Sequence, residues 1–85
     1  MNRIDVTVRY FAAARAAAGI ETETLCIPAD TTVADLVELV GTDRAALAKV
    51  LTRCSFLCDG IAVRDRAERL STNRTVDVLP PFAGG

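Results

Sequence analysis

An alternation of apolar and polar residues near the N-terminus places the strongest constraint on the fold. From residue 4 to residue 11 the chain reads IDVTVRYF, with apolar residues at every second position. Side chains of a β-strand point alternately to the two faces of a sheet. The pattern therefore predicts a strand whose buried face carries Ile4, Val6, Val8 and Tyr10. Such a strand needs neighbouring strands and a layer packed over its buried face.

The next segments predict a short helix and a return strand. Residues 12–18 are all alanine except for one arginine, and alanine has the highest helix propensity. Gly19 stands where a helix C-terminus commonly takes a left-handed conformation. Residues 21–27 follow as a second strand, which we expect Pro28 to end. Because the connection is short, the two strands should be antiparallel neighbours.

An amphipathic main helix is predicted after the second strand. Thr32 is a suitable N-cap, and Asp35 places negative charge in the first turn. We expect Gly41 to end this helix, and residues 43–51 to form a further helical stretch. The side chains expected to face the core are Val33, Leu36, Val37, Val40, Leu47, Val50 and Leu51.

Shorter strands complete the predicted pattern. We expect strands at 56–58, 61–63 and 75–79, the first two joined by a tight turn at Asp59-Gly60. Residues 64–69 form a charged loop before the anchor Leu70, and Thr72-Asn73 makes a turn. The fold class predicted is α+β, one mixed sheet packed against one main helix. We expect a domain over 1–79 and an extended, flexible tail over 80–85 that ends in Gly-Gly.

Composition and charge exclude several classes of function. Hydrophobic residues make up 51% of the chain and charged residues 25%, which is typical of a globular domain and not of a disordered one. The net charge is −1 and charges of both signs are interleaved, so we expect neither nucleic acid nor a membrane as a partner. The N-terminus has no leader pattern, and three cysteines fit a reducing compartment, so we expect a cytosolic protein.

Most of the cysteine and aromatic residues are predicted to have structural roles. Three residues separate Cys54 from Cys58, which is not the spacing of a zinc-finger knuckle. Only Cys26 could be a third ligand and the chain has no histidine, so we expect no metal site. The three cysteines are expected to be buried or half-buried small residues of strands. Tyr10, Phe11 and Phe56 are expected to lie mainly in the core. Phe11, where strand gives way to helix, is also a candidate for a partner contact. The loop over 64–69 is expected to be solvated, or else to meet a partner by charge complementarity.

The sequence closes on LPPFAGG, which indicates a chemical role. Pro80 and Pro81 donate no backbone hydrogen bond, so the sheet should end there and the chain should extend outward. Six extended residues reach roughly 18–20 Å, at about 3.1–3.3 Å each. Gly84 and Gly85 carry no Cβ, so a close-fitting channel could surround them and leave the carboxylate of Gly85 accessible. That carboxylate needs activation, most simply as an acyl-adenylate made from ATP. Because the chain has no phosphate-binding loop, a partner enzyme must supply this step.

These features resemble the MoaD family, the small subunits of molybdopterin synthase, within the ubiquitin-like MoaD/ThiS sulfur carriers. The resemblance covers essentially the whole chain. It is carried by Phe11-Ala12 with Arg15 and Gly19, by Thr32-Val33, and most specifically by the ending Pro80-Pro81-x-x-Gly84-Gly85. It implies a β-grasp fold.

The resemblance also implies a function. A MoeB-like enzyme would use ATP to adenylate Gly85, and a sulfur donor protein would convert it to a thiocarboxylate. The tail would then enter a MoaE-like large subunit and donate sulfur for the molybdopterin dithiolene. Such a chain acts within a hetero-oligomer, binds no cofactor of its own and has no activity alone. Gly84 would give clearance and Phe82 would anchor the tail, with Pro80, Pro81, Ala83 and Phe11 as further partner contacts.

Two alternatives remain open. The same glycine could carry sulfur for thiazole synthesis, as in ThiS, or for cysteine synthesis, or could conjugate to lysines as ubiquitin does. A different class of protein would be an interaction module with a β-grasp fold and an inert tail.

Overall fold

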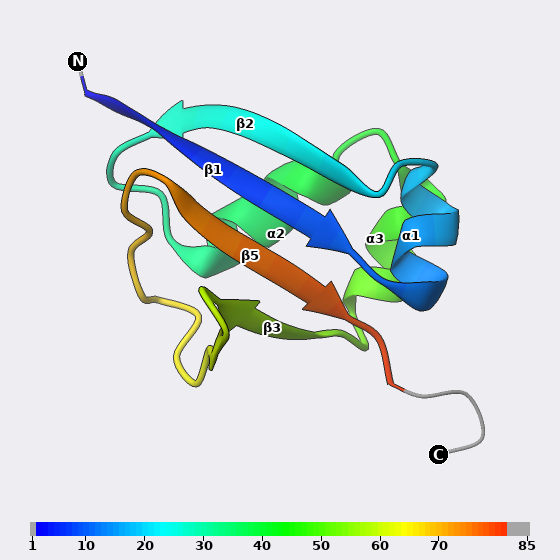
Figure 1. The fold of residues 1–85 in the computed structure, drawn as a ribbon. Helices are drawn as coiled ribbons and strands as arrows, with labels where there is room; N and C mark the ends of the chain where they lie inside the picture. Colours follow the sequence, from blue (N-terminus) through cyan, green and yellow to red (C-terminus); the bar gives the residue numbers. More distant parts are fainter. Residues whose placement is uncertain (1, 82–85) are drawn as a thin grey trace.

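The protein folds as one five-stranded sheet with helices against one face (Figure 1). The structure is a computed structural model and describes residues 2–81. The elements are β1 (Arg3–Tyr10), α1 (Ala12–Ala18), β2 (Thr22–Pro28), α2 (Val33–Gly41), α3 (Ala45–Leu51), β3 (Ser55–Cys58), β4 (Ile61–Ala62) and β5 (Arg74–Leu79). The predicted α+β class, a mixed sheet packed against a main helix, is confirmed.

The strand order is β2-β1-β5-β3-β4, with β1 and β5 side by side near the centre of the sheet. β1 pairs with β2 in antiparallel register, as the short connection predicted. β1 also pairs with β5, in parallel, with Tyr10 opposite Val78. Parallel pairing makes neighbouring strands end at the same edge of the sheet. The chain that leaves β5 therefore starts beside the end of β1.

The core lies between the sheet and the helices. Val6, Val8 and Tyr10 are buried and Ile4 is half-buried, so the buried face predicted for the first strand is confirmed. The side chains that meet them from β5 and the helices are Val76, Val78, Val33, Leu36, Val40, Leu47 and Leu51. Val37 and Val50 pack at the margin of this cluster and are half-buried.

Three turns take the left-handed backbone that their residues favour. Gly19 has φ 77° at the C-cap of α1. Asp59 and Gly60 have φ 49° and 82° and join β3 to β4, which is the tight turn predicted there. Asn73 has φ 63° just before β5. These predictions are confirmed.

β2 ends at Pro28 and α2 ends at Gly41, as predicted, and both residues lie inside their elements. Pro28 is the last residue of β2, so the strand includes the proline. The Tyr10 N–H donates to the Glu21 carbonyl and the Ala29 N–H to the Asn2 carbonyl, so the odd-numbered residues of β2 bond to β1. The nitrogen of Pro28 then faces the free edge, where a proline costs no ladder bond. Gly41 is the last residue of α2, and the C-cap is Thr42.

The charged loop over 64–69 is exposed, as expected, but its backbone also holds the start of α2. The Val33 N–H donates to the Glu68 carbonyl (3.0 Å), and the Ala34 N–H donates to the Arg66 carbonyl (2.9 Å). The first N–H groups of a helix have no partner within the helix, so the loop satisfies two of them. None of the helices among residues 2–81 is long and apolar enough to cross a membrane.

Candidate partner-binding site

The candidate site is the corner of the sheet where β5 ends. The Phe11 N–H donates to the Val78 carbonyl (3.3 Å), so the residue after β1 is hydrogen-bonded to the C-terminal end of β5. Leu79 and Pro80 are half-buried and Pro81 is exposed. Figure 1 shows this segment leaving the sheet past the tip of the β5 arrow. The start of the tail is therefore fixed to the folded domain.

An ion pair lies on the sheet face opposite the helices. Arg9 Nε donates to Asp77 Oδ1 (2.6 Å), and Arg9 Nη2 donates to Asp77 Oδ2 (2.8 Å). Arg9 and Asp77 are register partners on β1 and β5, so both side chains point to the same face. The Asp77 side chain is only 8% exposed, whereas the Arg9 side chain is 49% exposed. The hydrogen bonds that Arg9 donates to Asp77, and the negative charge of Asp77, raise the pKa of Arg9, so this guanidinium is charged at every physiological pH.

Phe11 lies next to this ion pair and is partly open to solvent. Its side chain is 38% exposed, so the core interpretation is wrong for Phe11, although it holds for Tyr10 and Phe56. Phe11 is the N-cap of α1, where the chain turns away from the sheet. The central carbon of the Arg9 guanidinium lies 5.6 Å from the centre of the Phe11 ring, within the range of a cation–π contact. We call the group Arg9, Phe11, Asp77, Leu79 and Pro80 the β5 corner.

Two of the three cysteines are shielded from solvent. Cys54 is buried and Cys58 is half-buried, as predicted, but Cys26 is exposed, because its position on β2 faces away from the helices. Burial raises the pKa of the Cys54 and Cys58 thiols, which lowers their thiolate fraction and makes them poor nucleophiles. Across residues 2–81, no three acidic or cysteine side chains gather in a way that could hold a metal ion.

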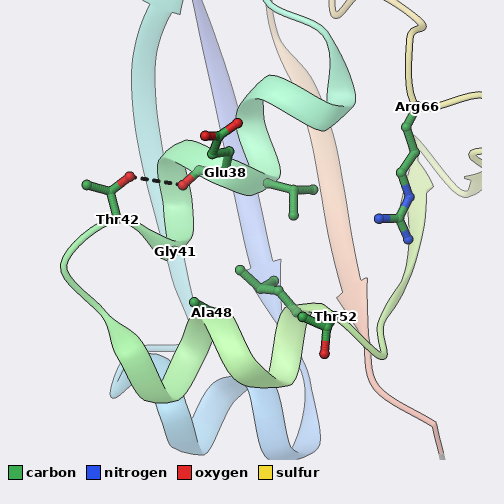
Figure 2. A pocket seen from close by; sticks show the side chains of 8 residues that line it. Glu38, Gly41, Thr42, Ala48, Thr52 and Arg66 are labelled. Atoms are coloured by element: carbon green, nitrogen blue, oxygen red, sulfur yellow. Dashed lines mark hydrogen bonds between the residues drawn. The ribbon is translucent and has the colours of Figure 1, made fainter.

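A groove in the helix layer is the main alternative site (Figure 2). It has a volume of about 430 Å³ and runs between α2 and α3. One wall is Arg66, whose guanidinium stacks over the Phe56 ring (4.8 Å) and whose Nη2 donates to the Cys54 carbonyl (3.3 Å). The other lining residues are Val37, Glu38, Gly41, Thr42, Ala48, Leu51 and Thr52. The groove contains no cysteine and no pair of titratable groups in contact, so it offers no grouping for catalysis.

Four predicted site residues, Phe82, Ala83, Gly84 and Gly85, lie outside the described residues. Of the other three, Phe11 and Pro80 belong to the β5 corner, and Pro81 is the next residue along the chain. The Arg9–Asp77 pair was not predicted from the sequence. The sequence places Arg9 at an outward position of the first strand and Asp77 on the last strand. Their opposite charges indicate an ion pair only once the parallel register of β1 and β5 is known.

Comparison with known proteins decides the family. The model of the ThiS family matches residues 8–85, nearly the whole chain. The chain belongs to the ThiS family. No curated protein sequence matches it significantly.

Solved structures agree with this ThiS-family fold. A Pyrococcus furiosus protein assigned as subunit 1 of a molybdopterin converting factor is 25% identical, with a TM-score of 0.83, and the match covers 93% of this chain and 99% of that one. Small archaeal modifier protein 1 of Methanosarcina acetivorans is 24% identical over 100% of both chains, with a TM-score of 0.82. A chain in the Helicobacter pylori complex of subunits 1 and 2 of molybdopterin-converting factor is 21% identical, with a TM-score of 0.67, over 96% of this chain and 100% of that one. The ubiquitin-like β-grasp fold that the resemblance implied is confirmed.

The family match also bears on the tail. It begins inside β1 at Val8 and runs through β5 to Gly85, so it includes the β5 corner and the Gly-Gly motif in one continuous alignment. In this ThiS-family protein the motif follows β5 after two prolines, and the first of these prolines is half-buried.

Proposed function

We propose that this ThiS-family protein is a sulfur carrier that takes up sulfur at the carboxyl carbon of Gly85 and delivers it as the small subunit of a cytosolic molybdopterin synthase. The observation that carries the proposal is the continuity from β5 to Pro80-Pro81-x-x-Gly84-Gly85, at a corner that exposes Phe11. The family match through Gly85 supports it, as does the similarity to a protein assigned as subunit 1 of a molybdopterin converting factor.

The chemistry requires two partner activities. A MoeB-like enzyme would bind ATP, and the Gly85 carboxylate would attack its α-phosphorus and release pyrophosphate. Hydrosulfide supplied by a donor protein would then attack the acyl carbon and displace AMP, and the loss of its proton would leave a thiocarboxylate. This chain contributes a terminus without Cβ atoms, which a narrow active site can surround, on a tail that begins with two prolines.

The acceptor of the sulfur would be a MoaE-like large subunit. The Helicobacter pylori structure pairs subunit 1 with subunit 2, and its subunit 1 has the fold described above. By analogy, we infer that this chain works within a hetero-oligomer. The tail would reach the active site of the large subunit, and the open face of the sheet around the β5 corner would meet the surface beside the entrance.

Intact-mass measurement tests the carrier function. The chain is incubated with the MoeB-like enzyme of the same organism, ATP and a sulfur donor. We expect a mass gain that equals the exchange of one oxygen for one sulfur, located in the C-terminal peptide. A matched control carries one alanine after Gly85. It should unfold at the same temperature as the parent chain and gain no sulfur. If the unextended chain is never loaded, the carrier proposal is wrong.

A second candidate keeps the carrier and changes the acceptor. The ThiS-family match concerns the carrier chain and not the enzyme that consumes the sulfur, so thiazole synthesis, cysteine synthesis and conjugation to lysines are the alternatives. Affinity capture with the loaded chain separates them. Recovery of a MoaE-like protein supports the molybdopterin branch, and recovery of a thiazole synthase, a cysteine synthase or isopeptide conjugates contradicts it.

A further inference from the structure

The two charged side chains of the β5 corner differ in exposure: Arg9 is open to an approaching partner and Asp77 is covered. The Asp77 carboxylate is almost fully covered and already accepts two hydrogen bonds from Arg9. Half of the Arg9 side chain remains exposed, and within residues 2–81 its Nη1 has no hydrogen-bond partner. An approaching surface therefore meets a positively charged donor edge, to which no protein group among residues 2–81 is bonded, before it meets the carboxylate.

Arg9 is also held in place. Two parallel hydrogen bonds to Asp77 fix the plane of the guanidinium, and the Phe11 ring lies beside it. A side chain that is ordered before binding loses little conformational freedom in the complex. The free edge of Arg9 is therefore a directional contact point and differs from a mobile surface charge.

The position of Arg9 next to the tail decides what covers it. Asp77 is followed at once by Val78, Leu79 and Pro80, so any protein that receives the tail and packs against the domain must cover this corner. Guanidinium donors that lose water and gain no acceptor are costly, so the covering surface has to supply one. A carboxylate is the acceptor that matches a guanidinium edge best.

We propose that the protein that receives the tail binds the free edge of Arg9 with a carboxylate, set in an apolar surface that packs on Phe11 and Leu79. This inference rests on the proposed function, because it takes the MoaE-like large subunit as the covering protein. It adds the chemistry of that subunit's docking surface and identifies Arg9 as the residue that determines specificity. A basic residue in the same place would meet the exposed positive edge and be repelled.

Two variants separate a recognition role from a structural one. Arg9→Leu combined with Asp77→Ala removes both charges and leaves no buried carboxylate without a partner. Asp77→Asn keeps Arg9 and removes the carboxylate that neutralises it. Affinity for the purified large subunit of the same organism is measured by calorimetry, and thermal unfolding of each variant shows that it is folded.

We expect the double variant to bind at least about tenfold more weakly than the parent chain, because the partner carboxylate is then covered without a counter-charge. Asp77→Asn should lose less affinity than the double variant, because Arg9 keeps its charge although the amide oxygen can accept only one of its two hydrogen bonds. The inference is overturned if the double variant binds within about threefold of the parent, or if Asp77→Asn loses as much affinity as the double variant.

The failure of this inference and that of the proposed function have different signatures. Both variants retain the tail, so loading of Gly85 in the intact-mass assay tests the carrier chemistry separately from docking. One outcome is that the parent chain is loaded with sulfur and binds the large subunit while the two variants have equal affinities for it. In that case only the role of Arg9 is wrong. If the parent chain does not bind the large subunit, the molybdopterin branch is wrong and this inference is overturned with it.

Discussion

A polar network of three residues ties the sheet to the loop between α2 and α3. Arg44 donates to both oxygens of Glu23, from Nη1 to Oε2 (2.9 Å) and from Nη2 to Oε1 (3.2 Å). The Tyr10 hydroxyl donates to the same carboxylate. The Arg44 hydrogen bonds lower the pKa of Glu23, and burial is the main cause that raises the pKa of Tyr10. The carboxylate is the acceptor for all of these bonds, so the network depends on its charge.

The ionisation of Glu23 predicts how stability depends on pH. A carboxyl group whose pKa is lower in the folded state stabilises the fold above its unfolded value, here 4.5, and this contribution disappears as pH falls through the folded pKa. We therefore expect the melting temperature to fall on acidification below about pH 4.5. Glu23→Gln should be less stable than the parent at pH 7, and the difference should shrink in acid. Thermal unfolding between about pH 2 and 7 measures both. Parallel curves for the two proteins would contradict the prediction.

At the scale of elements, α2 depends on its N-cap. The Thr32 hydroxyl accepts from the Asp35 N–H (3.1 Å), and the Asp35 carboxylate accepts from the Thr32 N–H (3.2 Å), a complete capping box. Thr32→Val keeps the branched shape and removes the acceptor. We expect it to lower the free energy of unfolding by about 1 kcal/mol. Urea denaturation measures this loss, and Thr32→Ser, which keeps the hydroxyl, should stay within about 0.5 kcal/mol of the parent.

The crossing of α2 and α3 depends on a glycine. A Cβ added at Gly41 would lie 3.1 Å from the Ala48 Cβ and 3.3 Å from its Cα. Alanine gains about 0.8–1.0 kcal/mol over glycine in helix propensity, but overpacking costs about 1–3 kcal/mol. Because the contact is with backbone and a short side chain, the helices themselves must separate. We expect Gly41→Ala to destabilise the protein by about 1 kcal/mol in urea denaturation. Ala48→Gly in the same chain should recover part of the loss, and a stabilised Gly41→Ala variant would show that the helices adjust freely.

The elements could be predicted from the sequence because local patterns determine them. The alternation over 4–10, the Thr32 cap and the Asp59-Gly60 turn each specify their structure within a few residues. The parallel pairing of β1 with β5 could not be predicted in this way, because it joins positions as far apart as Tyr10 and Val78. The Arg9–Asp77 ion pair depends on that pairing, so sequence reasoning missed it, whereas an exposed Phe11 was one of the two alternatives that the sequence left open. The tail motif, by contrast, is local and could be identified directly.

At the scale of the whole molecule, folding and the proposed function occupy separate parts of the chain. Among the described residues, the buried hydrophobic side chains all lie in sequence from Val6 to Val78. The β5 ladder ends at Leu79, and the reacting group proposed above is at Gly85. The first and last strands meet at the β5 corner, so the domain must be folded before the tail is presented from a fixed position.

This separation predicts the effect of truncation. A chain that ends at Pro81 keeps all of β5 and the buried core, so its melting temperature should change by less than about 4 °C, which corresponds to less than about 1 kcal/mol for a domain of this size. It should gain no sulfur in the intact-mass assay. A matched chain that ends at Val76 loses the buried Val78 and the Asp77 partner of Arg9, and we expect it to be unfolded by circular dichroism. If the chain ending at Pro81 melts at a much lower temperature than the parent, residues 82–85 contribute to the folded domain, and the proposed division between domain and tail is wrong.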